Sequence, residues 1–331
     1  MRKFYILLFL MNIFFISCSK KNADDFVAYP YDPLNDTVWV NQPSVTSPVY
    51  KIPELLSFPP TEDSFDVAAG ANIRVSEILN ITFPSAGFTL ANGTAVTGKV
   101  KVEVTHLHKR GDFIRFALQT VAFDKLLAAG GAFFIRVTKG GQELILGPAK
   151  SIILLMREPI PVNNMKVFYG EQVLLPPVPL AINSTFTWAA AADLNNVTVF
   201  NGLDGSGPFS AYQFNSKRLN WISCNYSLDV TNTKTRTTAV LPLNFTNRNT
   251  LVFAILKDAK TVLQLDGQGN AKSFTIEDIP LNKDIILVSI SKIGEDFYLG
   301  SKEITVDKNG RVSFTPVKKT KAAVEQFLDA L

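Results

Sequence analysis

Short runs of alternating polar and apolar residues recur along this chain, and they constrain its fold more than any other feature. Residues 99–105 alternate strictly, which places every second side chain on one face of a half-buried strand. Residues 131–138, the glycine turn at 139–141 and residues 142–146 predict a β-hairpin. The pattern therefore predicts an all-β fold of mostly antiparallel strands, most naturally arranged as β-sandwiches.

Clusters of proline interrupt this pattern and set the expected domain boundaries. Proline fixes φ and removes a backbone donor, so a proline-rich segment favours extended chain over an inner strand. Seven prolines lie between Ser19 and Glu62, where we expect a tether, and five more mark a linker. The expected organisation is a signal peptide (1–17), a lipidated cysteine with its tether (18–62), a first β-sandwich-like domain (63–158), a linker (159–184), a second β-rich domain (185–316) and a C-terminal helix (317–331).

Shorter segments carry further expectations. Residues 123–129 predict a single helical turn that ends at Gly130. Residues 307–310 are expected to form a hairpin turn between the strands on either side. The C-terminal segment predicts an amphipathic helix that docks on its own domain. The apolar face of that helix consists of Val324, Phe327, Leu328 and Leu331.

The N-terminus resembles a bacterial export signal that ends in a lipid-modified cysteine. Arg2 and Lys3 precede an apolar run at 4–16, which is shorter than the roughly 20 residues that cross a bilayer as a helix. A spanning anchor is therefore not expected. An ordinary cleaved signal would end in a small-x-small pattern, whereas residues 15–18 (Phe-Ile-Ser-Cys) resemble a lipoprotein box with Cys18 as the acceptor.

This resemblance implies that Cys18 carries diacylglycerol and becomes the first residue of the mature protein. Two or more acyl chains hold a protein stably on a membrane, so the lipid at Cys18 is the expected anchor, and no other cofactor is expected. Ser19 is compatible with transfer to the outer membrane, on either its periplasmic or its cell-surface face. With 33 basic and 29 acidic residues, the chain gives no indication of a nucleic-acid partner.

Several internal segments resemble the β-domains of large lipoproteins of Bacteroidota. They are residues 83–88 (Phe-Pro-Ser-Ala-Gly-Phe), residues 131–135 with the glycine turn after them, and residues 219–225 (Leu-Asn-Trp-Ile-Ser-Cys-Asn). The motifs are structural and imply no general activity for the family. Asp36-Thr37-Val38 also resembles a short O-glycosylation sequence of Bacteroidota, which makes Thr37 a candidate for modification.

The two histidines of the chain, His106 and His108, are the best candidates for site chemistry. Side chains two apart on a strand share a face, so both imidazoles can reach one metal ion, with Glu103 or Asp112 as a third ligand. The competing interpretation is a solvent-facing pair near a turn. Cys224 lies in an aromatic and aliphatic run and is expected to be a buried, inert thiol.

Two functional hypotheses follow from these features. The leading one is a non-enzymatic, lipid-anchored envelope protein that binds or assembles with envelope proteins or glycans. The alternative is an envelope-associated hydrolase or metal-dependent enzyme that acts on polymers, with the histidine pair as its best candidate residues. The chain has no serine-hydrolase elbow, phosphate loop or His-Glu-x-x-His run, so we expect no enzyme of those classes.

Overall fold

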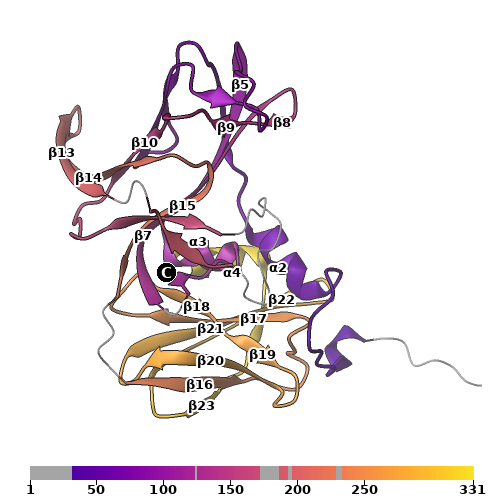
Figure 1. Ribbon diagram of the computed structural model, residues 1–331. Helices are drawn as coiled ribbons and strands as arrows, with labels where there is room; N and C mark the ends of the chain where they lie inside the picture. Colours follow the sequence, from indigo (N-terminus) through magenta and orange to yellow (C-terminus); the bar gives the residue numbers. More distant parts are fainter. Residues whose placement is uncertain (1–31, 124, 172–185, 193–195, 229–232) are drawn as a thin grey trace, which may run out of the picture. The chain divides into compact units, whose positions relative to one another are not determined.

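The computed structural model describes residues 32–123, 125–171, 186–192, 196–228 and 233–331 (Figure 1). The chain divides into two compact units, Met1–Asp36 and Thr37–Leu331. The described part of the first unit contains a short 3-10 helix, η2 (Pro33–Asn35), in which Oδ1 of Asp32 accepts a hydrogen bond from the Leu34 amide. The second unit consists mostly of antiparallel strands, so the all-β prediction is confirmed.

The first β-sandwich consists of two sheets, which we call A and B. Sheet A has the strand order β1-β5-β7-β15-β11-β12, with β6 and β8 also paired to β7, and sheet B has the order β13-β14-β10-β3-β2. The strands of sheet A are β1 (Thr61–Asp66), β5 (Lys99–Leu107), β6 (Val121–Ala122), β7 (Lys125–Lys139), β8 (Gln142–Glu143), β11 (Lys166–Gly170), β12 (Trp188–Ala190) and β15 (Asn220–Ser227). The strands of sheet B are β2 (Ala71–Arg74), β3 (Leu79–Phe83), β10 (Ile152–Arg157), β13 (Val197–Asp204) and β14 (Gly207–Ser216), and a separate ribbon pairs β4 (Phe88–Thr89) with β9 (Ile145–Leu146).

The second β-sandwich consists of sheets C and D. Sheet C has the order β18-β17-β21-β22-β24, and sheet D has the order β19-β20-β16-β23. The strands of sheet C are β17 (Thr250–Leu256), β18 (Val262–Gln264), β21 (Asp284–Ile293), β22 (Asp296–Thr305) and β24 (Val317–Lys319). The strands of sheet D are β16 (Lys234–Val240), β19 (Asp266–Gln268), β20 (Ser273–Pro280) and β23 (Gly310–Ser313).

Strand alternation divides the apolar side chains among three cores. On β5, Val100, Val102 and Val104 face the core between sheets A and B, while Leu107 faces the opposite side. On β17, Val252 and its alternate neighbours face the core between sheets C and D. The remaining faces of sheets A and C contribute to a third core, which also takes up the helices.

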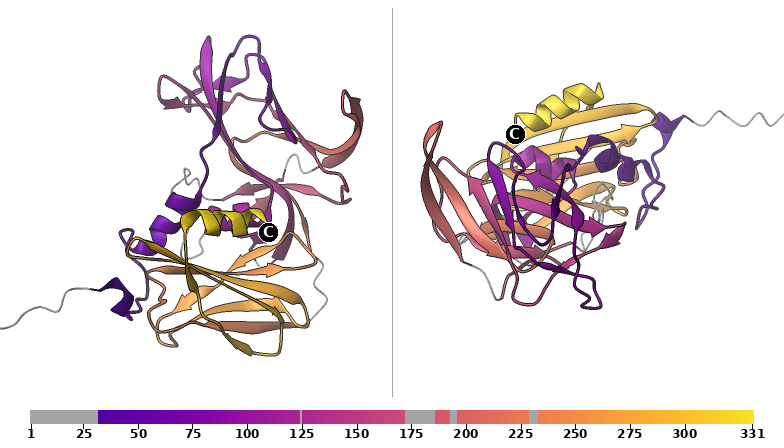
Figure 2. Two further views of the ribbon diagram at one scale, coloured as in Figure 1. Left: turned by 180° about the vertical axis from the view of Figure 1, so that it is seen from behind. Right: turned by 90° about the horizontal axis from the view of Figure 1, so that it is seen from above.

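Three helices complete this third core (Figure 2). They are α2 (Pro48–Leu56), α3 (Arg110–Arg115) and α4 (Lys321–Asp329). Arg115 joins them, because its guanidinium donates to the Leu56 carbonyl at 3.3 Å, to the Glu325 carbonyl at 2.8 Å and to Oδ1 of Asp329 at 2.7 Å. Buried Val324 and Leu328 confirm the predicted apolar face of the C-terminal helix, but the helix begins at Lys321 and not at 317, because residues 317–319 pair with β22 as strand β24.

The expected tether needs correction within its described part. Val49, Ile52 and Leu56 of α2 are almost completely buried in the third core. The ring of Trp39 lies 5.1 Å from that of Phe274, and Nδ2 of Asn247 donates to the Val40 carbonyl at 2.6 Å. Proline at the first turn of a helix is well tolerated, so Pro48 begins α2 instead of preventing it.

The expected linker at 159–184 does not separate the two sandwiches. Strand β10, before it, pairs with β14, after it, and β7 pairs with β15. The strands of the two sandwiches divide instead between Ser227 and Lys234. Alternation reports which face a residue occupies but not which strand it pairs with, and this is why the boundary was misplaced.

Two local predictions were also wrong, whereas one was confirmed. Residues 125–129 begin β7 and do not form a helical turn. The strand after 307–310 does not return to β22 as a hairpin, because β23 pairs in parallel with β16 of the opposite sheet. The hairpin between β7 and β8 is confirmed, with Gly140 and Gly141 at positive φ in its turn.

Candidate functional site

The two predicted modification sites are Cys18 and Thr37. Cys18 and the signal segment lie outside the described residues. Thr37 is exposed, so it is accessible to a modifying enzyme, and its glycosylation stays a prediction. Cys224 is a buried free thiol, and burial raises its pKa above the ordinary value, as expected for an inert cysteine.

The histidine pair lies at the end of β5 and faces the interior of the first sandwich. The ring of His106 stacks on Phe133, with 4.9 Å between centroids, and the two imidazole centroids are 5.6 Å apart. Nε2 of His106 and Nδ1 of His108 are shielded from solvent and have no hydrogen-bond partner among the described residues. The solvent-facing interpretation is therefore wrong for His106, which continues the inward face set by the valines of β5, whereas half-buried His108 lines a cavity.

Burial keeps both imidazoles neutral at physiological pH. Burial, with further contributions from His108 and Lys260, lowers the pKa of His106 to about 3. Burial and the charge of Lys260 lower the pKa of His108 to about 4, although Glu158 and a hydrogen bond with the Gly130 backbone oppose this shift. Both side chains therefore present uncharged nitrogens to their surroundings.

Neither expected third ligand joins the histidines. Oδ2 of Asp112 accepts hydrogen bonds from the amides of His108 and Lys109, at 2.9 and 2.8 Å, and so caps α3. Glu103 points to the opposite face of β5. Within the described ranges, no group of three or more His, Cys, Asp and Glu side chains is arranged to hold a metal ion.

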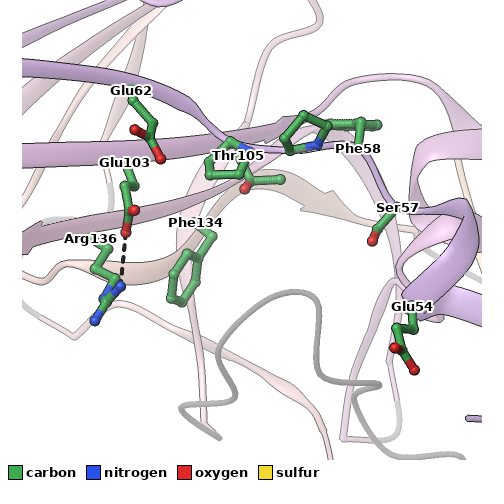
Figure 3. A pocket seen from close by; sticks show the side chains of 10 residues that line it. Glu54, Ser57, Phe58, Glu62, Glu103, Thr105, Phe134 and Arg136 are labelled. Atoms are coloured by element: carbon green, nitrogen blue, oxygen red, sulfur yellow. Dashed lines mark hydrogen bonds and ion pairs between the residues drawn. The ribbon is translucent and has the colours of Figure 1, made fainter.

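A cavity of about 520 Å³ lies where the segment after α2 crosses β5 and β7 (Figure 3). We call it the Glu103 cavity. Glu103 accepts from Lys101 at 2.7 Å and from Arg136 at 2.9 Å, and the hydrogen bond from Lys101 lowers the pKa of this carboxyl. Its lining residues are Glu54, Ser57, Phe58, Pro59, Pro60, Glu62, Glu103, Thr105, Phe134 and Arg136.

A second cavity, of about 660 Å³, lies beside the β13–β14 hairpin, and we call it the Arg157 cavity. The guanidinium carbon of Arg157 lies 4.1 Å from the centroid of Phe209, and its side chain pairs with Asp204. Hydrogen bonds from Ser206 and then Arg157 lower the pKa of Asp204 to about 2. The lining residues are Ile78, His108, Arg157, Pro159, Asn201, Gly202, Pro208, Phe209 and Ser210.

The walls of the Arg157 cavity are held by contacts among themselves. Oγ of Ser210 donates to Oδ1 of Asn201 at 2.8 Å, and Asp204 balances the charge of Arg157. A preformed pocket with an apolar wall and a few fixed polar groups is suited to ligand binding. Sequence reasoning singled out His108 but missed Arg157 and Phe209, since an arginine and a phenylalanine on separate strands carry no motif.

Comparisons with known proteins assign no family: no family model matches the chain, and no curated protein matches its sequence. The fold and the cavities define the structural class of the protein: an all-β protein of two sandwiches with a ligand-sized pocket. Within the part of the chain that the structure describes, no helix is both long and apolar enough to span a bilayer.

Proposed function

We propose that this chain is a lipid-anchored cell-envelope protein with a non-enzymatic binding role, and that the Arg157 cavity is its binding site. The observation that carries the binding role is this cavity of about 660 Å³, in which Phe209 and two prolines supply apolar contact beside fixed polar groups. The anchor rests on the lipoprotein box that ends at Cys18.

The charge state of the cavity favours binding over proton transfer. A general acid or base works best when its pKa lies near the operating pH. The pKa of His108, at about 4, and that of Asp204, at about 2, both lie well below neutrality. These groups keep one protonation state at physiological pH, which suits a surface that recognises a ligand.

The proposed anchor would hold the binding site close to its partners in the cell envelope. Two or more acyl chains at Cys18 would confine the protein to one leaflet, most simply of the outer membrane. Confinement raises the effective concentration of the binding site toward other envelope components, so a modest intrinsic affinity suffices. Envelope proteins and glycans are the expected partners.

The anchor is tested by labelling and fractionation in the native host. The wild type should incorporate labelled palmitate and sediment with outer membranes, whereas Cys18→Ala should lose the label and leave the membrane fraction. A wild type that stays in the membrane without label would contradict the lipoprotein proposal. Protease added to intact cells then distinguishes the faces, because only a cell-surface protein would be digested.

The binding role is tested by cross-linking in native membranes, followed by purification of the full-length chain. Arg157→Ala combined with Phe209→Ala should abolish the cross-linked species that the wild type forms. Arg74→Ala serves as the matched control, since Arg74 is an exposed arginine of sheet B paired with Glu77. Equal cross-linking by all three proteins would contradict the assignment of the Arg157 cavity and leave the anchor untouched.

A further inference from the structure

Soft metal-ligating side chains gather around the glycine pair Gly130–Gly131 of β7. The chain has four methionines, two of which, Met1 and Met11, lie in the signal segment. Met156 of β10 and Met165, just before β11, are buried in the core of the first sandwich. Both approach the glycine pair, and His106 approaches it as well. Residues from separate strands thus meet where β7 carries no side chain.

The geometry at Gly131 brings a thioether and an imidazole to one point. The position that a Cβ of residue 131 would take lies 2.8 Å from Sδ of Met156 and 3.4 Å from Nε2 of His106. The methyl group of Met165 lies 3.4 Å from the equivalent position at Gly130. Glycine at position 131 therefore lets Sδ of Met156 pack against the backbone of β7, on the side where Nε2 of His106 also lies.

Two nitrogen atoms of the histidine pair have no partner among the described residues: one lies beside Gly131, on His106, and the other is on His108, whose ring centroid is 5.6 Å from that of His106. Nε2 of His106 and Nδ1 of His108 are buried, and neither forms a hydrogen bond within that part of the chain. A buried polar atom without a partner costs about 1–3 kcal/mol, so native proteins rarely leave one unless something binds it. Two such nitrogens within one histidine pair indicate a bound group that bridges them.

The types of ligand atom and the nearby positive charge both favour a soft, monovalent metal ion as the bound group. Thioether and imidazole ligands in an apolar core select soft ions such as Cu(I) over hard ones. Nζ of Lys260 donates to the Gly130 carbonyl at 3.2 Å and so places a positive charge beside the cluster. This charge opposes a divalent ion about twice as strongly as a monovalent one, because Coulomb energy scales with charge.

We propose that His106, His108 and Met156 form a binding site for one Cu(I) ion at the core of the first sandwich. Met165 lies beside these ligands and closes the site. His108 also forms part of the wall of the Arg157 cavity, so an ion reaches the site from solvent past this side chain. The inference goes beyond the proposed binding role; the two share His108, but His106 and Met156 do not line the Arg157 cavity, so variants of these two residues separate metal binding from the role of the cavity.

The test is a titration of the full-length, lipidated protein with Cu(I) under anaerobic, reducing conditions, in competition with a chromophoric Cu(I) chelator. The wild type should bind one equivalent. Met156→Leu and His106→Phe should each weaken binding at least about tenfold, the scale seen when the support of a metal site is removed. Met156→Leu nearly preserves side-chain volume, and His106→Phe keeps an aromatic ring that can stack on Phe133.

Two control variants separate loss of a ligand from disturbance of the core and from binding at the thiol. Ile152→Val removes a methylene from the same buried strand and should bind Cu(I) like the wild type. Cys224→Ser should also bind normally; loss of binding here, with Met156→Leu unaffected, would assign the metal to the thiol and overturn the proposal. Near-ultraviolet circular dichroism checks that each variant is folded. If a ligand variant does not fold, X-ray absorption of the loaded wild type identifies the ligands instead.

Three further outcomes would overturn the proposal. No binding by the wild type would show that the two histidines and Met156 do not form a copper site. Equal affinity for Zn²⁺ would contradict the soft, monovalent class. Unchanged binding in both ligand variants would place the metal elsewhere. X-ray absorption of the loaded wild type should show sulfur and nitrogen scatterers together, and nitrogen alone would exclude Met156.

Discussion

The two sandwiches have cores of different chemistry, although the same alternating strands form both. The core between sheets C and D is lined by hydrocarbon side chains such as Val252, Leu256 and Phe274. The core between sheets A and B also holds Met156, Met165 and Cys224, with the histidine pair at its end. Both apolar cores stabilise the unit, whereas the buried thioethers, the thiol and the imidazoles are gathered in the first sandwich.

Removing a large hydrocarbon from the third core, which sheet C shares with the helices, should give the largest effect. Phe253 of β17 is fully buried on the side of sheet C that faces the helices. Phe253→Ala should lower the free energy of unfolding by about 3–5 kcal/mol, because it removes buried area and leaves a cavity. Urea denaturation measures this loss. The control Phe200→Ala, at a side chain 39% exposed, should change stability far less.

Acidification should lower the free energy of unfolding through the two histidines of the first sandwich. The pKa values of His106 and His108, about 3 and about 4, lie below the ordinary value, so their contribution to stability is complete above about pH 6.5. As the pH falls from 6.5 to 5, the unfolded state takes up protons that the folded state does not. The loss should be about 1–2 kcal/mol for each histidine.

Denaturation at a series of pH values, with a metal chelator present, measures this slope. Replacing both histidines with glutamine should flatten the curve between pH 6.5 and 5, a range above the ordinary titration of carboxyl groups. An identical slope in the double variant would show that other groups control stability there, and the contrast between the two cores would fail.

A smaller loss of stability is expected where α3 packs on α4, in the core that sheets A and C share. A Cβ at Gly111 of α3 would lie 1.9 Å from the Leu328 carbonyl oxygen of α4, which cannot move without displacing the helix. Gly111→Ala should cost about 1–3 kcal/mol through overpacking. The matched control is Gly205→Ala, where nothing lies within 4 Å, and it should be nearly neutral. Equal melting temperatures for both variants would contradict the close packing of α3 on α4.

The smallest effect is expected at the surface of the second sandwich. Arg236 of β16 pairs with Glu277 of β20 at 2.7 Å, and both side chains are more than half exposed. Solvent and salt screen such a pair, so Arg236→Ala should cost less than about 1 kcal/mol. Denaturation in low and high salt measures it. A loss comparable to that of Phe253→Ala would show that buried apolar side chains contribute no more to stability here than exposed ion pairs.

Local pattern predicted much of the secondary structure. The alternation of residues 99–105 correctly gave β5 and the side of it that is buried, and extending that alternation by one residue would have placed His106 inside as well. The glycine turn after β7 was correct for the same reason, since positive φ is a local requirement. Most predictions that depend only on neighbours along the chain therefore succeeded, although the helical turn expected at 123–129 gave way to the start of β7.

Predictions that depend on pairing between distant strands failed. Proline at 159–184 suggested a boundary, but β7 and β10 both find partners beyond it. Strand β23 leaves its sequence neighbour β22 to join sheet D. The hydrophobic pattern of a strand is satisfied by any apolar sheet, so register and partner follow from the packing of the whole unit.

What the sequence alone determined is local: the all-β class, strand β5 and the apolar face of the C-terminal helix, while the export signal and the lipid site at Cys18 stay predictions. Only the tertiary structure decided that Arg157 meets Phe209 at a cavity, and that Met156 reaches His106 across two glycines. Backbone geometry defines which neighbours share a face, while closed packing of distant strands defines which side chains meet.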